Sequence, residues 1–282
     1  TGGYVAIPVL AAAALLRIPT LLWEGNRIPG RSVRLSARLA TLRTVSYAAT
    51  VDRLPAPTFV TGTPIRDLGS VETSAARARL GLTADVPVLL GFGGSQAVKR
   101  LSDAVREALP DVVARCYVLH ITGESAIDEA EALRASLSPE HQDRYRPYAF
   151  LREDMDAALS AADLLVGRAG SSTLAEAAAA GLPMIVVPYP HAAAHQKANA
   201  AEMVEAGAAD LVDDEDLDGD TLRAACDLLF DQRLAAMSGA ALSVARPGAA
   251  AASAHLLEIL AAREPLPSQD ELDELTRAAS TK

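Results

Sequence analysis

Apolar runs of strand length alternate with stretches of helical periodicity along most of the chain. After about residue 69 the predicted strands are PVLLGFGG, CYVLHITG, YRPYAFL, ADLLVG and MIVVPYP, at residues 87–94, 116–123, 145–151, 162–167 and 184–190. Helical segments of about 10–15 residues separate these strands. Such alternation predicts a parallel, doubly wound α/β sheet.

The same alternation opens the chain on a smaller scale. A helix is predicted at about 6–16, a strand at 19–25 (PTLLWEG), an arginine-studded helix at about 30–42, and short strand-like pieces in TVSYAA and TFVTG. A segment of this size buries only ~60% of its unfolded surface. We therefore expect residues 1–60 to be the C-terminal part of a second, similar domain whose beginning is absent.

These patterns together predict the domain organisation. The fold class is α/β, with two Rossmann-like doubly wound parallel-sheet domains, the first one incomplete. The proline-marked stretch at 61–68 is interpreted as a linker, and 69–245 as a complete domain. A closing helix is expected at 246–263 and a flexible tail at 264–282.

Composition and charge exclude several classes of protein. Half of the residues are hydrophobic, so a substantial core is expected, and the formal net charge of −10 argues against a nucleic-acid partner. The two cysteines, Cys116 and Cys226, lack metal-ligand spacing and are interpreted as reduced core residues of a cytoplasmic protein. The apolar run from Tyr4 to Leu16 has 13 residues, whereas a membrane span needs about 20.

A glycine-rich turn, GFGGSQ, joins a predicted strand to a helix at Gly91–Gln96. Glycines let the backbone approach a ligand closely, and the free N–H groups at a helix start favour an anion such as a diphosphate. Ser95 can add a hydroxyl. The alternative is an ordinary tight turn.

A second strand-to-helix turn, GRAGSSTLAE, follows the strand at 162–167. Ser171, Ser172 and Thr173 place hydroxyls at the helix start, and Glu176 lies one turn behind Ser172 on the same face. A carboxylate there can accept both hydroxyls of a ribose. The alternative is an ordinary capped helix with a capping box.

Polar side chains cluster at the next strand-to-helix junction, in PYPHAAAHQKANA. They are His191, His195, Gln196 and Asn199, and such neutral donors and acceptors suit the hydroxyls of a sugar. A metal site is a poor alternative, because no carboxylates accompany the histidines. We expect neither a metal nor a cofactor, and the acidic run at 212–218 (VDDEDLD) is interpreted as a surface loop.

The run from Arg168 to Asn199 resembles the donor-binding signature of MurG-type UDP-N-acetylglucosamine transferases, in glycosyltransferase family 28. TGGYVAIP, WEGNRIPG, VTGTPIR and GFGGSQAVKR follow the order and spacing of that family, so the resemblance covers about residues 1–262. It implies the GT-B arrangement of two Rossmann-like domains, with UDP-GlcNAc held mainly by the second.

The resemblance also implies roles for individual residues. Glu176 would bind the ribose, and the turns at Ser95 and Ser171–Thr173 would hold the diphosphate. The backbone of Leu151 would read uracil, and Arg66 would approach the diphosphate. His195, Gln196 and Asn199 would face the sugar. Matching positions on the acceptor side are Gly2, Gly3, Tyr4, Glu24 and Asn26.

The chain departs from the family pattern mainly on the acceptor side. Trp23 and Gly25 replace a His and a Gln, Thr63 replaces an Asn, and His195 stands where Gln is frequent. An inverting transferase needs a base for the acceptor hydroxyl. The family's glycine-rich loop and its histidine, proposed to assist catalysis, would precede Thr1, which leaves Glu24 as the candidate base.

An arginine-rich helix face suggests contact with a membrane surface. Arg31, Arg34 and Arg38 lie close to one face, with Arg27 and Arg43 flanking them. The face is either merely solvated or contacts anionic lipid head groups or an acceptor diphosphate. In the second case the protein is peripheral, on the cytoplasmic face of the cell membrane.

The resemblance implies inverting transfer of GlcNAc from UDP-GlcNAc to a polyprenyl-diphosphate-linked muramyl-pentapeptide, which converts lipid I to lipid II in peptidoglycan synthesis. Two alternatives remain. A UDP-GlcNAc 2-epimerase shares the GT-B architecture but should show additional acid/base groups. A donor-binding half would need a partner chain for activity.

Overall fold

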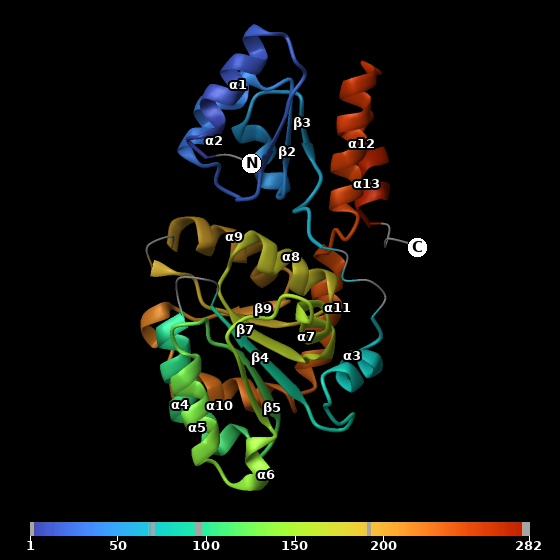
Figure 1. Ribbon diagram of the computed structural model, residues 1–282. Coiled ribbons are helices and arrows are strands. Elements are labelled where there is room, and N and C mark those ends of the chain that lie inside the picture. The colour runs from blue at the N-terminus through green and yellow to red at the C-terminus, as the bar shows by residue number, and fades with distance from the viewer. Residues whose placement is uncertain (1–2, 67, 69–70, 94–97, 191–192, 278–282) are drawn as a thin grey trace. The chain divides into compact units, whose positions relative to one another are not determined.

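A computed structural model describes residues 3–66, 68, 71–93, 98–190 and 193–277 (Figure 1). The chain divides into two compact units. One joins Thr1–Asp67 to Ala245–Lys282, and the other comprises Leu68–Val244. The second unit differs by one residue at each end from the domain expected at 69–245, and the C-terminal helices belong to the first unit.

The second unit is built on a parallel sheet that has six strands in the described part of the chain. The strands are β4 (Val88–Phe92), β5 (Tyr117–Ile121), β6 (Tyr145–Tyr148), β7 (Leu164–Gly167), β8 (Met184–Val186) and β9 (Ala209–Leu211). Their order is β6-β5-β4-β7-β8-β9, and every neighbouring pair is parallel. The predicted parallel, doubly wound sheet is confirmed.

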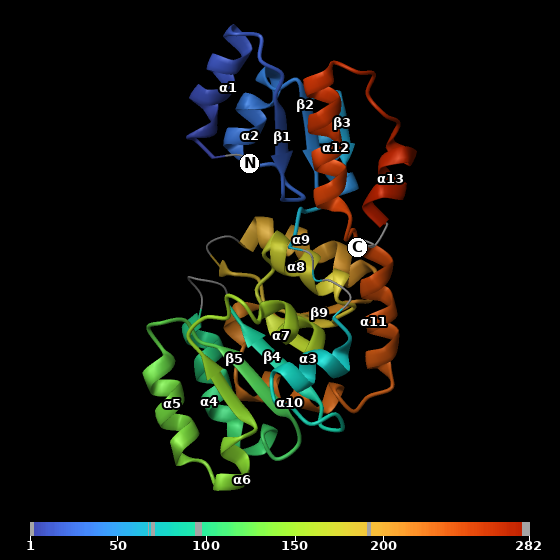
Figure 2. The same cartoon turned by 45° about the vertical axis from the view of Figure 1, so that its right-hand side comes forward.

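Helices cover both faces of this sheet (Figures 1 and 2). On one face lie α4 (Val98–Val112), α5 (Ile127–Ser136) and α10 (Gly219–Leu228), with the short α6 (Pro139–Gln142) leading into β6. On the other lie α3 (Thr73–Arg79), α7 (Met155–Ala161), α8 (Ser171–Ala179), α9 (Ala193–Glu205) and α11 (Arg233–Val244). The sequence pattern did not predict α3, α6 or α11.

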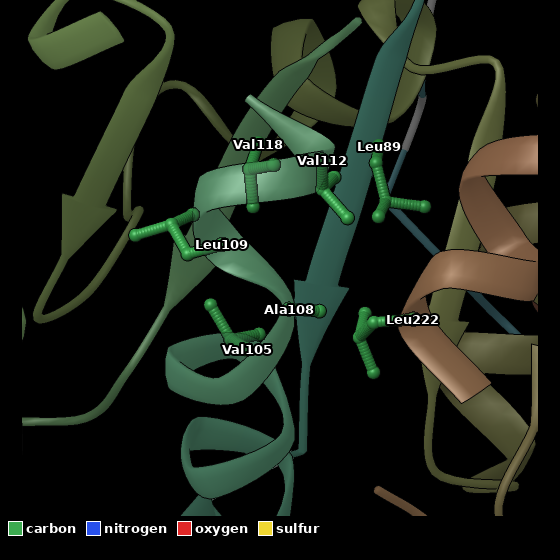
Figure 3. Close-up of a pocket in the computed structure, with 7 residues that line it drawn as sticks. All are labelled: Leu89, Val105, Ala108, Leu109, Val112, Val118 and Leu222. Atoms are coloured by element: carbon green, nitrogen blue, oxygen red, sulfur yellow. The ribbon is translucent and has the colours of Figure 1, made fainter. Parts of the chain in front are cut away.

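The core of this unit lies where α4 and α10 pack on the sheet. Leu89, Val118 and Leu164 from the strands meet Val105 of α4 and Leu222 of α10, all buried. A cavity of about 10 Å³ remains among the apolar side chains there (Figure 3). It is no larger than one water and offers no polar partner, so it is a packing void and not a ligand site.

The first unit holds a smaller parallel sheet, three-stranded in its described residues, of order β1-β2-β3. The strands are β1 (Leu21–Glu24), β2 (Leu42–Val45) and β3 (Thr58–Val60), and η2 (Ala48–Arg53) joins the last two. One face packs on α1 (Ala6–Leu15), α2 (Arg31–Ser36) and η1 (Ala37–Leu39), and the other on α12 (Ala249–Ala262) and α13 (Gln269–Arg277) (Figure 2).

Arg43, expected to flank the basic helix face, is instead buried in β2 with 3% of its surface exposed. Its Nη1 donates to the carbonyls of Ala37 (3.1 Å) and Ala40 (2.8 Å), and its Nε donates to that of Pro57 (3.1 Å). Burial lowers the pKa of this guanidinium. Arg43 therefore ties the chain after η1 to the segment before β3 and is not available to lipids.

The flexible tail expected at 264–282 is also corrected, because it contains α13. Leu272 of this helix is buried in the core between α12 and the sheet. Gln269 accepts the N–H of Val60 and donates to its carbonyl, both at 2.9 Å. The side-chain amide thus pairs with the edge strand β3 as a neighbouring strand would.

A buried histidine lies in the core of the second unit. His120 on β5 is 1% exposed, its Nδ1 lies 2.9 Å from Tyr145 Oη, and its Nε2 lies 3.4 Å from Ser102 Oγ. Burial lowers the pKa of His120 to about 4, so the imidazole is neutral at neutral pH.

Replacing Gln269 by Ala should destabilise the first unit by roughly 1–3 kcal/mol, because Val60 loses both of its partners from that amide. Trp23, the only tryptophan, lies on β1 and reports unfolding of this unit by its fluorescence during urea titration. The matched control is Glu274→Ala on the exposed side of the same helix, expected within about 0.5 kcal/mol of the parent. Equal unfolding midpoints for all three proteins would contradict the role of Gln269.

The buried His120 should make stability depend on pH. Between its ordinary pKa of 6.5 and its folded pKa of about 4, the unfolded state binds more protons, so stability is complete above pH 6.5 and decreases as the pH falls toward 4. The contribution is about 3 kcal/mol. His120→Gln should flatten the dependence of the unfolding free energy on pH, whereas His255→Gln, at an exposed position, should leave it nearly unchanged. A parent-like slope in His120→Gln would refute this.

Candidate functional site

The order in which strands are added reverses between β4 and β7 in the parallel sheet of the second unit. From β4 the chain adds β5 and β6 on one side, and β7, β8 and β9 then follow on the other. In open α/β sheets a ligand binds outside the carboxyl ends of the strands at such a switch point. The two turns singled out in the sequence, after β4 and after β7, flank this point. Residues 94–97, including Ser95, lie outside the described residues.

Glycine is required where β4 and β7 approach each other. Gly167 pairs with Phe92 across the switch point, and a Cβ at Gly167 would lie 2.8 Å from the Phe92 carbonyl oxygen. A side chain at Gly167 would therefore push the two strands apart at the carboxyl edge. The predicted turn after β7 thus starts from a constrained strand end.

The start of α8 departs from the capped-helix alternative. Its N-cap is Gly170, no side-chain cap is found in this described turn, and the capping box suggested by the sequence is wrong. A Cβ at Gly170 would meet Thr173 Oγ1 only at 3.6 Å, and its φ of −69° is ordinary. Protein packing alone therefore does not demand glycine, whose missing side chain leaves room in front of the helix N–H groups.

The polar residues of α8 are arranged as the sequence predicted. Ser172 is exposed, Ser171 and Thr173 are half-buried, and Glu176 lies one turn behind with 9% of its surface exposed. The first turn of α8 thus offers hydroxyls and the positive end of the helix dipole to an anion. Glu176 is a carboxylate at the buried end of the same face.

The start of α9 is held by one of the predicted sugar-facing residues. Gln196 Oε1 accepts the N–H of Tyr189 at 2.7 Å and so fixes the turn after β8. Asn199 is almost completely buried, with 1% exposed, and His195 is half-buried. His191 lies outside the described residues. Gln196 therefore has a structural partner in addition to any ligand.

Arg168 opens the run that resembles the donor-binding signature, but the sequence analysis gave it no role of its own. It follows β7, is 7% exposed, and its Nη1 donates to the Val187 carbonyl at 3.2 Å. The same nitrogen lies 2.5 Å from Asp214 Oδ1, and the guanidinium lies 5.5 Å from the centre of the Tyr189 ring. Arg168 thus links the ends of β7 and β8.

An aromatic residue just after β6 is a candidate base-binding residue that the sequence analysis missed. The side chain of Leu151 is buried, while the adjacent Phe150 is 64% exposed and has the guanidinium of Arg152 at 5.7 Å from its ring centre. An exposed aromatic ring at a strand end is a surface on which a planar base can stack. The signal in the sequence was an aromatic residue next to Leu151 at the strand end.

On the first unit, Glu24 is committed to its own loop. The carboxylate is 4% exposed, and Oε1 accepts both the backbone and the side-chain N–H of Asn26 at 2.9 Å. Oε2 accepts the N–H of Gly30 at 2.9 Å. Three donors from its own loop and burial to 4% exposure leave little access for an acceptor hydroxyl, so this geometry favours a loop-organising carboxylate over a base.

Of the other residues predicted in the first unit, Gly3, Tyr4 and Arg66 are exposed and Asn26 is half-buried, whereas Gly2 lies outside the described residues. Gly3 and Tyr4 precede α1, and Tyr4 is 71% exposed. Since α1 leads directly into β1 and packs beside it, its start lies at the end of the sheet where β1 ends and Asn26 follows. Arg66 is exposed at the C-terminal end of the 1–67 segment.

The described residues offer neither a metal-ligand cluster nor a membrane-spanning helix. No group of three or more His, Cys, Asp or Glu side chains there offers a ligand set for a metal ion. Among the helices that the structure describes, none combines the length and apolarity needed to cross a bilayer.

Comparison with known proteins identifies relatives along most of the chain. Residues 88–254 match the glycosyltransferase family 28 C-terminal domain. A UDP-N-acetylglucosamine–N-acetylmuramyl-(pentapeptide) pyrophosphoryl-undecaprenol N-acetylglucosamine transferase from Frankia casuarinae is 40% identical over 271 residues, which are 93% of this chain and 70% of that protein.

Solved structures agree with this assignment. The MurG crystal structure from Acinetobacter baumannii superposes with a TM-score of 0.72 at 29% identity, covering 93% of this chain and 72% of that one. A Listeria monocytogenes protein described as a UDP-N-acetylglucosamine 2-epimerase gives 0.66 at 16% identity, covering 95% and 76%, and shares the fold alone. The chain belongs to glycosyltransferase family 28.

Proposed function

We propose that this protein transfers GlcNAc from UDP-GlcNAc to a polyprenyl-diphosphate-linked muramyl-pentapeptide, the step from lipid I to lipid II in peptidoglycan synthesis. The observation that carries the proposal is the uncapped start of α8 at the switch point, with Glu176 one turn behind it. The name of the Frankia relative supplies the donor and the acceptor class.

Different residues of the site bind different parts of the donor. The diphosphate lies before the N–H groups and hydroxyls of Ser171–Thr173, and Glu176 accepts the ribose hydroxyls. The backbone of Leu151 reads uracil, with the exposed Phe150 beside it. Ser95 completes the diphosphate contacts within this unit, and the sugar faces His195, Gln196 and Asn199. The diphosphate contact that the resemblance implies for Arg66 stays a prediction.

The reaction is an inverting displacement. The acceptor hydroxyl oxygen forms a bond to the anomeric carbon, the bond from that carbon to the UDP oxygen breaks, and UDP leaves with the electron pair. The N-terminus of α8 stabilises the negative charge that develops on the diphosphate, because its dipoles are already oriented. The hydroxyl proton passes to a base that the described residues do not identify, since Glu24 is occupied by its own loop.

The acceptor is proposed to bind at the first unit, near Gly3, Tyr4 and Asn26. These positions lie at the end of the β1-β2-β3 sheet where the strands terminate. Asn26 is held by Glu24, so the loop between β1 and α2 has a defined conformation in which to receive the lipid-linked sugar.

The alternatives predict different products. The epimerase alternative rests on fold similarity at 16% identity, whereas the transferase proposal rests on a relative at 40%. Incubation with UDP-GlcNAc and the lipid-linked acceptor should release UDP and form lipid II. UDP-ManNAc without acceptor would indicate epimerisation. UDP binding without turnover would favour a donor-binding half that needs a partner chain.

We also propose that the first unit attaches peripherally to anionic membrane, at the cytoplasmic face. Val9 and Leu15 of α1 and the preceding Val5 are 64%, 86% and 83% exposed. The neighbouring α2 and η1 expose arginines at 31, 34 and 38 and also Leu35, which is 71% exposed. Apolar side chains beside basic ones suit the boundary of an anionic bilayer.

Glu176→Ala should weaken UDP binding by about 1.5–3 kcal/mol, because the ribose loses a charge-assisted hydrogen bond. Calorimetric titration measures the affinity. The sharper comparison uses 2′,3′-dideoxy-UDP, which lacks the hydroxyls and should bind the variant and the parent equally. Glu140→Ala, on the exposed surface of α6, should leave both affinities unchanged. An equal loss for both nucleotides would exclude the ribose assignment.

Replacing Arg31, Arg34 and Arg38 together by Gln should weaken binding to vesicles that contain phosphatidylglycerol by about 1 kcal/mol per residue at low salt. Co-sedimentation measures the bound fraction. The matched control replaces three exposed arginines of the second unit, namely Arg106, Arg223 and Arg233. Equal losses in the two triple variants would show that only total charge matters.

A further inference from the structure

The acidic run interpreted as a surface loop from the sequence is instead attached to the elements of the candidate site. It follows β9 and contains η4 (Asp214–Asp216). Asp214 Oδ1 lies 2.5 Å from Arg168 Nη1, at the end of β7. Asp214 Oδ2 lies 3.3 Å from Arg100 Nε, in the first turn of α4. One carboxylate therefore joins the elements on both sides of the switch point.

Further contacts strengthen this attachment. Arg100 Nη1 donates to the Glu215 carbonyl at 3.2 Å, so the guanidinium holds both the side chain and the backbone of the loop. Lys197 of α9 lies 2.5 Å from Asp213 Oδ1. The loop thus contacts α4, which follows β4. It also contacts Arg168, which follows β7, and α9, which follows β8.

The topology explains why the loop passes there. β9 is the edge strand of the sheet, whereas α10, which follows the loop, packs beside α4 on the opposite face from α9. The connection must therefore cross the carboxyl ends of β8 and β7 to reach α4. Val212 pairs with Val186 at the start of this crossing, its N–H donating to the Val186 carbonyl at 3.0 Å.

Burial distinguishes Asp214 from its neighbour. The side chains of Asp214 and Arg168 are 15% and 8% exposed, whereas those of Asp213 and Lys197 are 41% and 49% exposed. An exposed ion pair contributes little, but removing one charge of a buried pair leaves the other uncompensated. Arg168 would then lose its charged partner and keep the carbonyls of Val187 and Pro188 as acceptors for its guanidinium.

We propose that Asp214 is a positioning residue for donor binding: through Arg168 and Arg100 it fixes the turn after β7 and the first turn of α4 in the arrangement that receives the diphosphate. This inference rests on the proposed function. Asp214 does not touch the nucleotide in this account. It holds the backbone that binds the nucleotide. A small displacement of that backbone weakens binding, because several hydrogen bonds to the nucleotide must form at once.

The test compares the UDP affinity of Asp214→Asn, Asp214→Glu and the parent by calorimetry, with thermal unfolding recorded for each. Asparagine keeps the shape but removes the charge, and should weaken UDP binding about tenfold. Glutamate restores the charge and should recover most of the affinity. Asp227→Asn is the matched control, since it removes an ion pair of the same 2.5 Å length with Arg115 on the solvent-exposed side of α10, and should change the affinity less than about twofold.

A second variant distinguishes weaker UDP binding from a loss of the folded state. Arg100→Gln removes the half-exposed partner of Asp214 and leaves the buried pair with Arg168 intact, so it should weaken UDP binding about threefold without loss of fold. Parent-like UDP affinity in both Asp214→Asn and Arg100→Gln would overturn the positioning role, even if the unfolding temperature falls. Absence of UDP binding by the parent would instead overturn the proposed function, and this inference with it.

Discussion

The reversal of strand order between β4 and β7 is the constraint on which the rest of the candidate site depends. It places the start of α8 at the carboxyl edge of the sheet where β4 and β7 are neighbours, without a side-chain cap in its described turn. Gly167 permits the close pairing with Phe92 from which this geometry starts. In the proposed complex, a diphosphate at that position supplies the negative charge that a helix N-terminus favours.

The charged residues behind the site show how the fold supports that arrangement. Arg168 and Asp214 are buried together, and Arg100 connects them to α4. In the first unit Glu24 organises the loop after β1 by accepting N–H groups on both oxygens, and Arg43 joins η1 to the chain before β3. In both units a charged side chain holds a loop that local sequence alone would leave undetermined.

Much of the fold could be predicted because its signals are local. The alternation of apolar runs and helical segments indicated the parallel sheet, and the serine-rich segment before Glu176 indicated the strand-to-helix turn after β7, where the candidate site is proposed. Long-range pairing could not be predicted in this way. Arg43 resembled a surface cation until its burial against backbone carbonyls was seen, Asp214 resembled a solvated acid, and α13 has a highly charged surface whose single buried leucine gives little apolar signal. The capping box failed for the opposite reason, since its residue pattern is present but the N-cap is Gly170.

The central claim is that the second unit, at the start of α8, recognises a uridine diphosphate. Calorimetric titration of UDP-GlcNAc, UDP and ADP into the chain tests it most directly. The account predicts saturable one-to-one binding of both uridine nucleotides and an affinity for ADP lower by at least about tenfold, which is roughly 1.4 kcal/mol. Equal affinities for UDP and ADP, or no binding by the folded chain, would contradict it.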